Sequence, residues 1–222
     1  MNNDDLKRKI KKGIALFIRF IKNPAFVCDD FFQFEFEKKM GITTRGFVKE
    51  SELGIPLDLN PYHYVPGGNV YLKKVLKRLR IKETDSIIDL GCGLGSPMLY
   101  MSKFPFKKIS GVEFSKELYL GCKKNFEKLN YPHVSVLYGD AGDFNSFDEY
   151  NYIFMFNPFG LVTMKRVLEN INQSYAQNPR IITLIYKNPL YGKEVLETEI
   201  FHKISEYKTE SSFKFFVYRT NI

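Results

Sequence analysis

The 222-residue chain lacks several features that would place it in a special class of protein. It has no tryptophan, and its three cysteines form neither the even framework of a secreted disulfide scaffold nor the paired spacing of a zinc site. No apolar stretch approaches the roughly 20 residues that a membrane-spanning helix needs. The apolar stretch nearest the N-terminus, residues 13–17, is soon interrupted by Arg19, and no small-residue cleavage site of a signal peptide follows it. We therefore expect a cytoplasmic protein with no membrane span, and we assign it no metal site.

The positive charge of the chain is concentrated at its N-terminal end. Residues 1–22 contain seven basic and two acidic residues, so they carry +5 of the net charge of +8. Apolar residues recur there every three or four positions, which predicts an amphipathic helix over residues 4–22. Such a helix either contacts an anionic membrane surface or RNA, or packs on the protein and leaves its lysines in solvent.

The next segment is expected to form a second helix and a cover. Five phenylalanines within residues 25–41 predict a helix that carries its aromatic side chains into the core. Residues 41–68 contain three prolines and five glycines, a composition typical of an irregular lid or binding loop. We divide the chain accordingly into an N-terminal helical extension and cover segment, residues 1–68, and a domain, residues 69–222.

Helical and strand patterns alternate from residue 69 onward. Strands separated by helices imply right-handed crossovers and a parallel sheet covered on both faces. Residues 209–211 are too few for a crossover, so the last strand has to run antiparallel. The prediction is an α/β fold, with a doubly wound, mostly parallel seven-stranded sheet and an antiparallel last strand. The expected strands are 86–90, 108–113, 133–138, 151–156, 180–186, 202–208 and 212–219, and the expected helices are 69–80, 97–103, 116–129, 161–175 and 192–200.

A glycine loop follows the first expected strand. Residues 86–97 combine an apolar strand, three alternating glycines and the start of a helix. The glycines would let the backbone turn tightly and approach a ligand closely. We expect Ser96 to be the N-cap and Pro97 the first helical residue, so unpaired N–H groups would favour an anionic ligand group there. The three glycines are Gly91, Gly93 and Gly95.

Polar residues stand at the ends of four successive strands. Ligands of a parallel sheet bind beyond the carboxyl ends of its strands, so these residues are expected to share one site. Asp89 precedes the glycine loop, and Glu113 ends the second strand, where it can accept both hydroxyls of a ribose. Asp140 follows the third strand and can accept from an adenine amino group, and Asn157 follows the fourth.

Together these signals resemble the class I S-adenosylmethionine-dependent methyltransferases. Residues 87–95 look like the first motif of that family, Glu113 like its ribose-binding acid, and Asp140-Ala141 like its adenine-contacting segment. The antiparallel last strand is also similar to that family, and the resemblance covers about residues 60–222. It implies S-adenosylmethionine as the cofactor, with the glycines along its methionine part and Phe114 beside its adenine. The cofactor-binding residues implied are Tyr64, Asp89, Gly91, Cys92, Gly93, Gly95, Glu113, Phe114, Asp140 and Ala141.

The main rival interpretation is a dinucleotide-binding oxidoreductase, which also has an acid on its second strand. Its fingerprint is G-x-G-x-x-G, whereas the glycines here alternate as G-x-G-x-G. The chain also has no obvious second domain for a hydride acceptor. Methyl transfer is therefore favoured.

The acceptor is indicated by Asn157, Pro158 and Phe159, the expected catalytic residues. They resemble the N-P-P-[YF] motif of amino-group methyltransferases, in which the asparagine oxygen and a proline carbonyl hold an N–H donor under an aromatic ring; one proline is missing here. Glu37-Lys38, residues 41–46 and Tyr64-x-Pro66 are loosely similar to the non-SET histone-lysine methyltransferases. The acceptor implied is an amino nitrogen of a protein or a small molecule.

Three alternatives stay open at the level of sequence. RNA is one other acceptor. Oxygen methylation would want a base or a divalent cation, for which Asp140, Asp143 and Asn157 offer oxygens. A non-catalytic binding protein that retains the cofactor fold would be indicated by a damaged glycine loop or a lost adenine acid, and both are intact.

Overall fold

The computed structural model describes residues 11, 14, 18, 21–45, 65–209 and 213–221. Most of the helix expected over residues 4–22 lies outside the described residues, and so does the segment 46–64 with Tyr64. Predictions on those residues stay predictions, as does the division of the chain at residue 68. No helix in the described part of the chain is long and apolar enough to cross a membrane.

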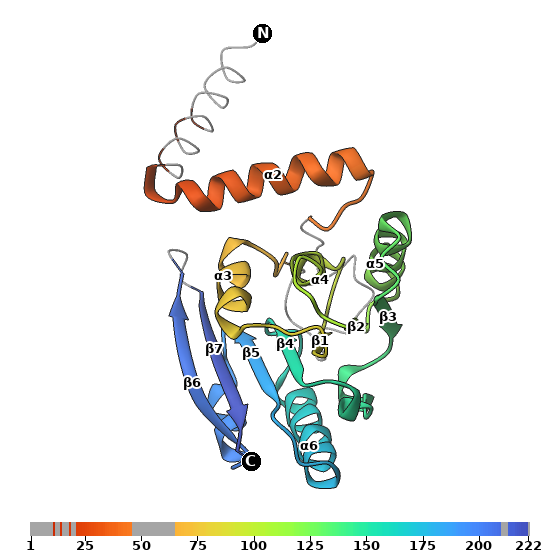
Figure 1. Cartoon of the computed structure of the whole chain (residues 1–222), viewed down its shortest axis with the longest axis vertical. Helices are drawn as coiled ribbons and strands as arrows, with labels where there is room; N and C mark the ends of the chain where they lie inside the picture. Colours follow the sequence, from red (N-terminus) through yellow and green to blue (C-terminus); the bar gives the residue numbers. More distant parts are fainter. Residues whose placement is uncertain are drawn as a thin grey trace.

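Seven strands form one sheet in the order β3-β2-β1-β4-β5-β7-β6 (Figure 1). The first five strands run parallel, while β7 lies between β5 and β6 and runs antiparallel to both. The predicted sheet, including its reversed last strand, is confirmed. The strands are β1 (Ser86–Leu90), β2 (Lys108–Glu113), β3 (Val134–Tyr138), β4 (Tyr152–Met155), β5 (Thr183–Lys187), β6 (Phe201–Lys208) and β7 (Lys214–Thr220).

Helices cover both faces of the sheet, because alternate residues of each strand point to opposite sides. Ile87 of β1 packs in a core cluster with α3, α4 and α5, whereas Ile88 packs in a second cluster with α6 and α7. This is the doubly wound arrangement that the sequence predicts. The helices are α2 (Pro24–Met40), α3 (Val70–Leu79), α4 (Ser96–Met101), α5 (Lys116–Leu129), α6 (Leu161–Gln177) and α7 (Gly192–Glu197), with short 3₁₀ turns at Ala141–Asp143 and Phe147–Glu149.

The start of α4 differs by one residue from the prediction. Ser96 is the first helical residue, and the N-cap is Gly95, which makes no side-chain capping bond. Gly95 has a φ of 86°, and a Cβ there would lie 2.6 Å from Phe126 and 2.8 Å from the Cys122 sulfur. Only glycine can adopt this backbone angle and lie this close to α5. Gly95 therefore stands at the N-cap position that the sequence predicts for Ser96.

The packing of α2 contradicts the prediction more strongly. Its fully buried residues are polar, Gln33 and Glu37, whereas Phe31, Phe32 and Phe34 are 59%, 68% and 53% exposed. The expectation that these aromatics enter the core was wrong. The remaining two, Phe26 and Phe36, pack only partly against the first core cluster.

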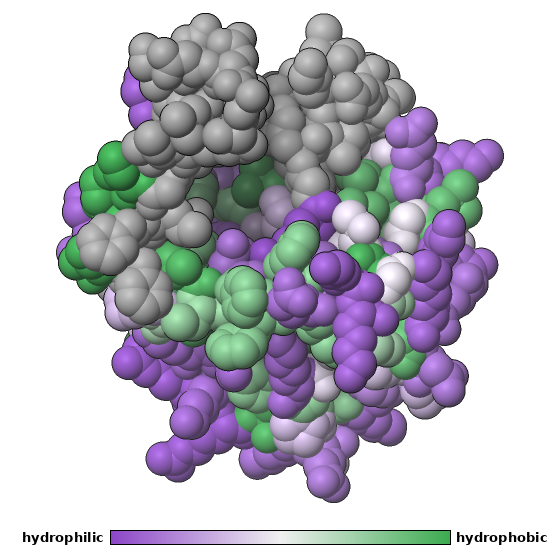
Figure 2. Space-filling model, turned by 90° about the horizontal axis from the view of Figure 1, so that it is seen from above, coloured by the Kyte–Doolittle hydropathy of each residue, from purple (hydrophilic) through white to green (hydrophobic). Residues whose placement is uncertain are grey.

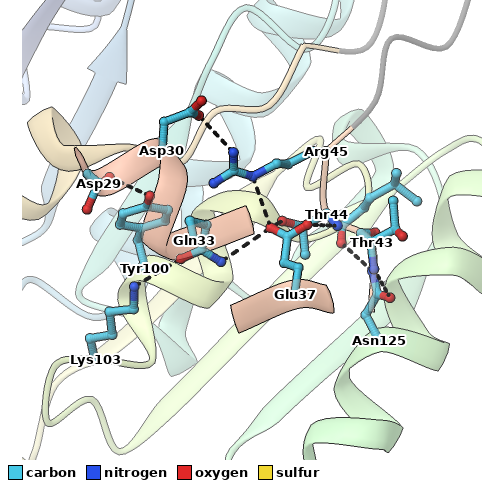
Figure 3. Close-up of polar contacts among 11 residues, drawn as sticks. Asp29, Asp30, Gln33, Glu37, Thr43, Thr44, Arg45, Tyr100, Lys103 and Asn125 are labelled. Carbon is cyan, nitrogen blue, oxygen red and sulfur yellow. Dashed lines mark hydrogen bonds and ion pairs between the residues drawn. The ribbon is translucent and has the colours of Figure 1, made fainter. Parts of the chain in front are cut away.

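A polar network explains how α2 can lie on the domain with its charged side inward (Figure 3). Glu37 accepts hydrogen bonds from the Thr44 backbone N–H at 3.1 Å and from the Thr44 hydroxyl at 2.7 Å. Tyr100, in α4, donates to Asp29 at 2.6 Å, and Lys103, just beyond α4, donates to Gln33 at 3.1 Å. These partners are distant in sequence, so the pattern of α2 by itself could not reveal them.

Candidate active site

The glycine loop and the Asn157 turn touch at the carboxyl edge of the sheet. The Gly91 and Cys92 N–H groups both donate to the Val112 carbonyl, at 2.9 and 3.1 Å, which ties the loop to β2. Gly91 has a φ of 78°, and a Cβ there would lie 2.2 Å from Cβ of Pro158. The end of β1 and the turn after β4 therefore adjoin at this edge of the sheet, where the sequence predicts a shared site.

Glu113 is the fixed point of this site. One carboxyl oxygen accepts from the Gly93 N–H and the other from the Ser115 N–H, each at 2.8 Å. Burial raises the pKa of the carboxyl, although these backbone bonds act in the opposite direction. A carboxylate oxygen has a second lone pair, so both oxygens keep the capacity to accept a ligand hydroxyl. This position suits the ribose contact predicted for Glu113.

Asp89 lies buried on the same edge and has an unmet hydrogen bond. Its Oδ2 has no partner among the residues that the structure describes. Burial, and next the charge of Glu113, raise the pKa of Asp89 well above its usual range. Two buried carboxyl groups that repel each other favour a ligand that brings positive charge or hydrogen-bond donors to them.

Asp140, the acid predicted to contact adenine, is bound to two groups of the protein. Its Oδ1 accepts from the Gly142 N–H at 2.8 Å, and its Oδ2 pairs with Arg166 at 3.0 Å. Ala141 is buried in the turn that follows, and Phe114 is 43% exposed beyond β2. An adenine amino group at Asp140 would share this carboxylate with Arg166, a residue of α6 that sequence reasoning missed.

The three residues expected to be catalytic occupy different environments. Asn157 and Pro158 are half-buried in the turn after β4, whereas Phe159 is buried and belongs to the second core cluster. The Phe159 ring therefore packs under the turn. Phe156, one residue beyond β4, is the half-buried aromatic on the opposite face.

A second Asn-Pro turn follows β5, and sequence reasoning missed it. Asn157 and Asn188 each lie two residues beyond the last register pair of β4 and β5, Met155 and Tyr186, and each is followed by a proline. Both asparagines have positive φ, 41° and 53°. Positive φ angles are costly for residues other than glycine, and a residue that precedes a proline is restricted mainly to extended conformations. Both asparagines therefore have a strained backbone.

The two turns are in contact, and they leave polar groups available. The Leu190 N–H points to Oδ1 of Asn157 at 3.5 Å, the limit of a hydrogen bond. The side-chain amide of Asn188 has no hydrogen bond to any of the residues described. Recurrence of Asn-Pro after a predicted strand was the signal that could have identified this second turn.

Lys187 lies between the turns and the aromatic residues, and it too was missed. Its Nζ donates to the Gly67 carbonyl at 3.0 Å and stands 3.9 Å from the centre of the Phe156 ring. No carboxylate pairs with it within the described segments. Burial alone lowers the pKa of this ammonium to about 7. Burial at the end of β5 therefore favours the uncharged form of an amine relative to water.

A metal centre has no support in the part of the chain that the structure describes. Those residues contain no group of three or more histidine, cysteine, aspartate or glutamate side chains placed to hold an ion.

The strand order, the glycine loop and the buried carboxyls define the class I S-adenosylmethionine-dependent methyltransferase fold. Consistent with this, residues 87–178 match the model of the methyltransferase domain family. The chain thus has the fold of the class I S-adenosylmethionine-dependent methyltransferases, and it is similar to the methyltransferase domain family over residues 87–178. The residues present fit S-adenosylmethionine, because its sulfonium and ammonium groups would bring positive charge to the unpartnered carboxyl oxygen of Asp89 and its ribose would bring hydroxyls to Glu113.

Similar proteins differ in the atom that they methylate. The chain is 30% identical over 122 residues to a probable cobalt-precorrin-6B C(15)-methyltransferase (decarboxylating) from Methanococcus vannielii, covering 55% of this chain and 66% of that one. It is 32% identical over 78 residues to a probable (S)-tetrahydroprotoberberine N-methyltransferase from Papaver bracteatum, covering 35% and 22%. The chain thus spans less than two thirds of these relatives.

A solved structure supports the fold alone. The S-adenosylmethionine-dependent methyltransferase from Aquifex aeolicus superposes with a TM-score of 0.56 at 17% identity, covering 68% of this chain and 89% of that one.

Proposed function

We propose that this protein transfers the methyl group of S-adenosylmethionine to an amino nitrogen of a protein or a small-molecule acceptor. The observation that carries the proposal is the pair of Asn-Pro turns, with Asn157 and Asn188 in register at the ends of β4 and β5 and the first turn against the glycine loop. Amide oxygens accept hydrogen bonds from an N–H donor but do not remove a proton. They suit an amine that reaches the site already uncharged.

Lys187 supports the idea that an amine would lose its charge here. A lysine-like amine with a pKa of about 10.4 must lose a proton before it can attack, which costs roughly 4.6 kcal/mol at pH 7. The burial that lowers the pKa of Lys187 to about 7 would act in the same direction on an acceptor amine bound against Phe156. The site would then supply much of the deprotonation cost by desolvation.

On the cofactor side, the chain's own residues bind and orient. The cofactor supplies an activated methyl group, so the protein has to hold the nucleophile about 3 to 3.5 Å from it and in line. Glu113 and the glycine loop would fix the ribose and methionine parts, and Asp89 would face a cationic group. Asn157 and Asn188 would then orient the acceptor nitrogen from the neighbouring strand ends.

The relatives support nitrogen and carbon acceptors alike. The Papaver relative is named an N-methyltransferase, and the Methanococcus relative a C-methyltransferase. The resemblance to histone-lysine enzymes would make the acceptor a protein lysine, and it remains a proposal.

The test is to incubate the purified chain with S-adenosylmethionine labelled in its methyl group and with fractionated cell extract. We expect the label in protein or in small amines. Analysis of the labelled products should show the methyl group bonded to nitrogen. Label in RNA, or as methyl ether or methyl ester, would contradict the amine proposal. Absence of transfer together with tight binding of S-adenosylhomocysteine would instead indicate a non-catalytic binding protein.

A further inference from the structure

The helix α2 is attached by the side that is normally exposed. Its inward residues Gln33 and Glu37 are buried and fully engaged in the network of Figure 3. Surface helices of globular proteins ordinarily bury their apolar stripe and expose their charges. Here hydrogen bonds as well as Phe26 and Phe36 hold the helix in place, while Phe31, Phe32 and Phe34 face away from the domain.

The outer face of α2 therefore carries large apolar side chains in water. Phe31, Phe32 and Phe34 are each more than half exposed, and the rings of Phe31 and Phe32 contact each other edge to face at 5.9 Å. Figure 2, which views the molecule from above α2, shows apolar side chains gathered on this face beside charged ones. Upstream, three more apolar residues are about half exposed or more, at positions spaced like one face of a helix. These are Ile14, Ile18 and Ile21.

The charges of this region are sorted as well. Asp29 and Asp30 bind Tyr100 and Arg45, and Glu37 binds Thr44 and Arg45, which engages the acids of α2 except Glu35. Lys38 and Lys39, in the last turn, are exposed. Residues 1–22 add a net charge of +5 directly before the helix. Three of the four acids of α2 are thus paired, with Tyr100 of the domain or with Thr44 and Arg45, while Lys38 and Lys39 leave positive charge exposed at the end of the helix.

Aromatic and aliphatic side chains combined with lysines match one kind of surface. A bilayer interface buries apolar side chains at the level of the headgroups, and anionic lipids attract the neighbouring lysines. We infer that the outer face of α2, formed by Phe31, Phe32, Phe34, Lys38 and Lys39, together with the Ile14–Ile18–Ile21 row, docks on an anionic lipid bilayer. None of these residues is among those that we place in the active site, and the inference does not depend on the proposed acceptor.

The test is co-sedimentation of the full chain with vesicles of phosphatidylcholine alone or mixed with phosphatidylglycerol. We expect binding to the mixed vesicles that weakens as salt is added, and little binding to phosphatidylcholine alone. The triple variant Phe31→Ser, Phe32→Ser, Phe34→Ser should bind the mixed vesicles about tenfold or more weakly. Its far-ultraviolet circular dichroism and its S-adenosylhomocysteine affinity should stay unchanged, because the replaced rings are exposed.

A matched control replaces three exposed apolar side chains of the domain, Leu120→Ser, Leu137→Ser and Val162→Ser. This control should bind vesicles like the unmodified chain. Equal binding by the phenylalanine triple variant would overturn the inference. Failure of the unmodified chain to bind either kind of vesicle would also overturn it. A third contrary outcome is that the unmodified chain sediments as a dimer and the triple variant as a monomer, since the face would then be an interface between copies.

Discussion

The edge where we propose the active site has two halves that are held by different means, a cofactor half formed by the glycine loop and Glu113 and an acceptor half formed by the turns after β4 and β5. On the cofactor half, both oxygens of Glu113 are fixed by backbone N–H groups at 2.8 Å, and the glycine loop is tied to β2 by backbone bonds. On the acceptor half, Asn157 has one long contact at 3.5 Å, and the Asn188 amide has no hydrogen bond within the described segments. The cofactor half is thus preorganised by backbone, whereas the acceptor half keeps its side chains available for a ligand.

The largest effect is expected from breaking the cofactor half. Glu113→Ala removes the proposed ribose acceptor and leaves the Gly93 and Ser115 N–H groups without their partner. Because a hydrogen bond to a charged group contributes about 1.5 to 3 kcal/mol, we expect S-adenosylhomocysteine to bind about 100-fold more weakly by calorimetry. Glu83→Ala, at an exposed glutamate, is the control and should bind normally. Unchanged affinity in Glu113→Ala would refute the preorganised cofactor half.

A smaller effect is expected from the acceptor half, and on a different quantity. Asn157→Ala should lower kcat by about 30-fold while S-adenosylhomocysteine affinity changes by less than about twofold, because misorientation of the nucleophile affects the transition state. Asn130→Ala is a suitable control, since this exposed asparagine also has a positive φ, 52°, but caps α5. Equal losses of turnover and affinity in Asn157→Ala would place this residue in the cofactor half instead.

Lys187 sharpens the comparison through pH. Its pKa is about 7 in the folded protein and about 10.5 when unfolded, so the unfolded chain binds more protons between these values and stability rises with pH. The free energy of unfolding of the unmodified chain should rise by up to about 1.4 kcal/mol per pH unit relative to Lys187→Met. Denaturant titrations from about pH 7 to pH 10 would measure this slope. If the free energy of unfolding depends on pH in the same way in the unmodified chain and in Lys187→Met, Lys187 is not desolvated. The control variant Lys124→Met, at an exposed lysine, should behave like the unmodified chain, and a change as large as that in Lys187→Met would also count against desolvation of the acceptor half.

The smallest effect is expected at the second turn. Asn188→Ala should raise the KM for the acceptor by about fivefold, the loss of roughly one neutral hydrogen bond, and leave cofactor affinity unchanged. Steady-state kinetics with the acceptor identified by labelling would measure it. A normal KM would restrict the acceptor half to the turn after β4.

Local patterns predicted much of the fold, and they predicted where in the fold the glycine loop and Glu113 lie. β1 and the glycine loop lie within twelve consecutive residues, and apolar runs bounded by turn residues located the strands closely. The strand ends could be placed at one edge because parallel crossovers bring them there. The acceptor half was only half predicted, because the pairing of Asn157 with Asn188 depends on the register between β4 and β5.

The sequence by itself determined the parallel sheet, the reversed last strand and the glycine loop. Alternating strand and helix patterns, the short connection at residues 209–211 and the alternating glycines can each be recognised within a short stretch of chain. Only the tertiary structure decided which side of α2 faces the domain, since Tyr100, Lys103 and Thr44 supply partners that a helical pattern does not contain. It also decided that the Phe159 ring enters the core, and that Lys187 loses its solvent beneath Gly67 and Phe156. The spacing of apolar residues along a helix shows that its two faces differ. The free energy of burying one of those faces, however, depends on the side chains of the surface that it contacts.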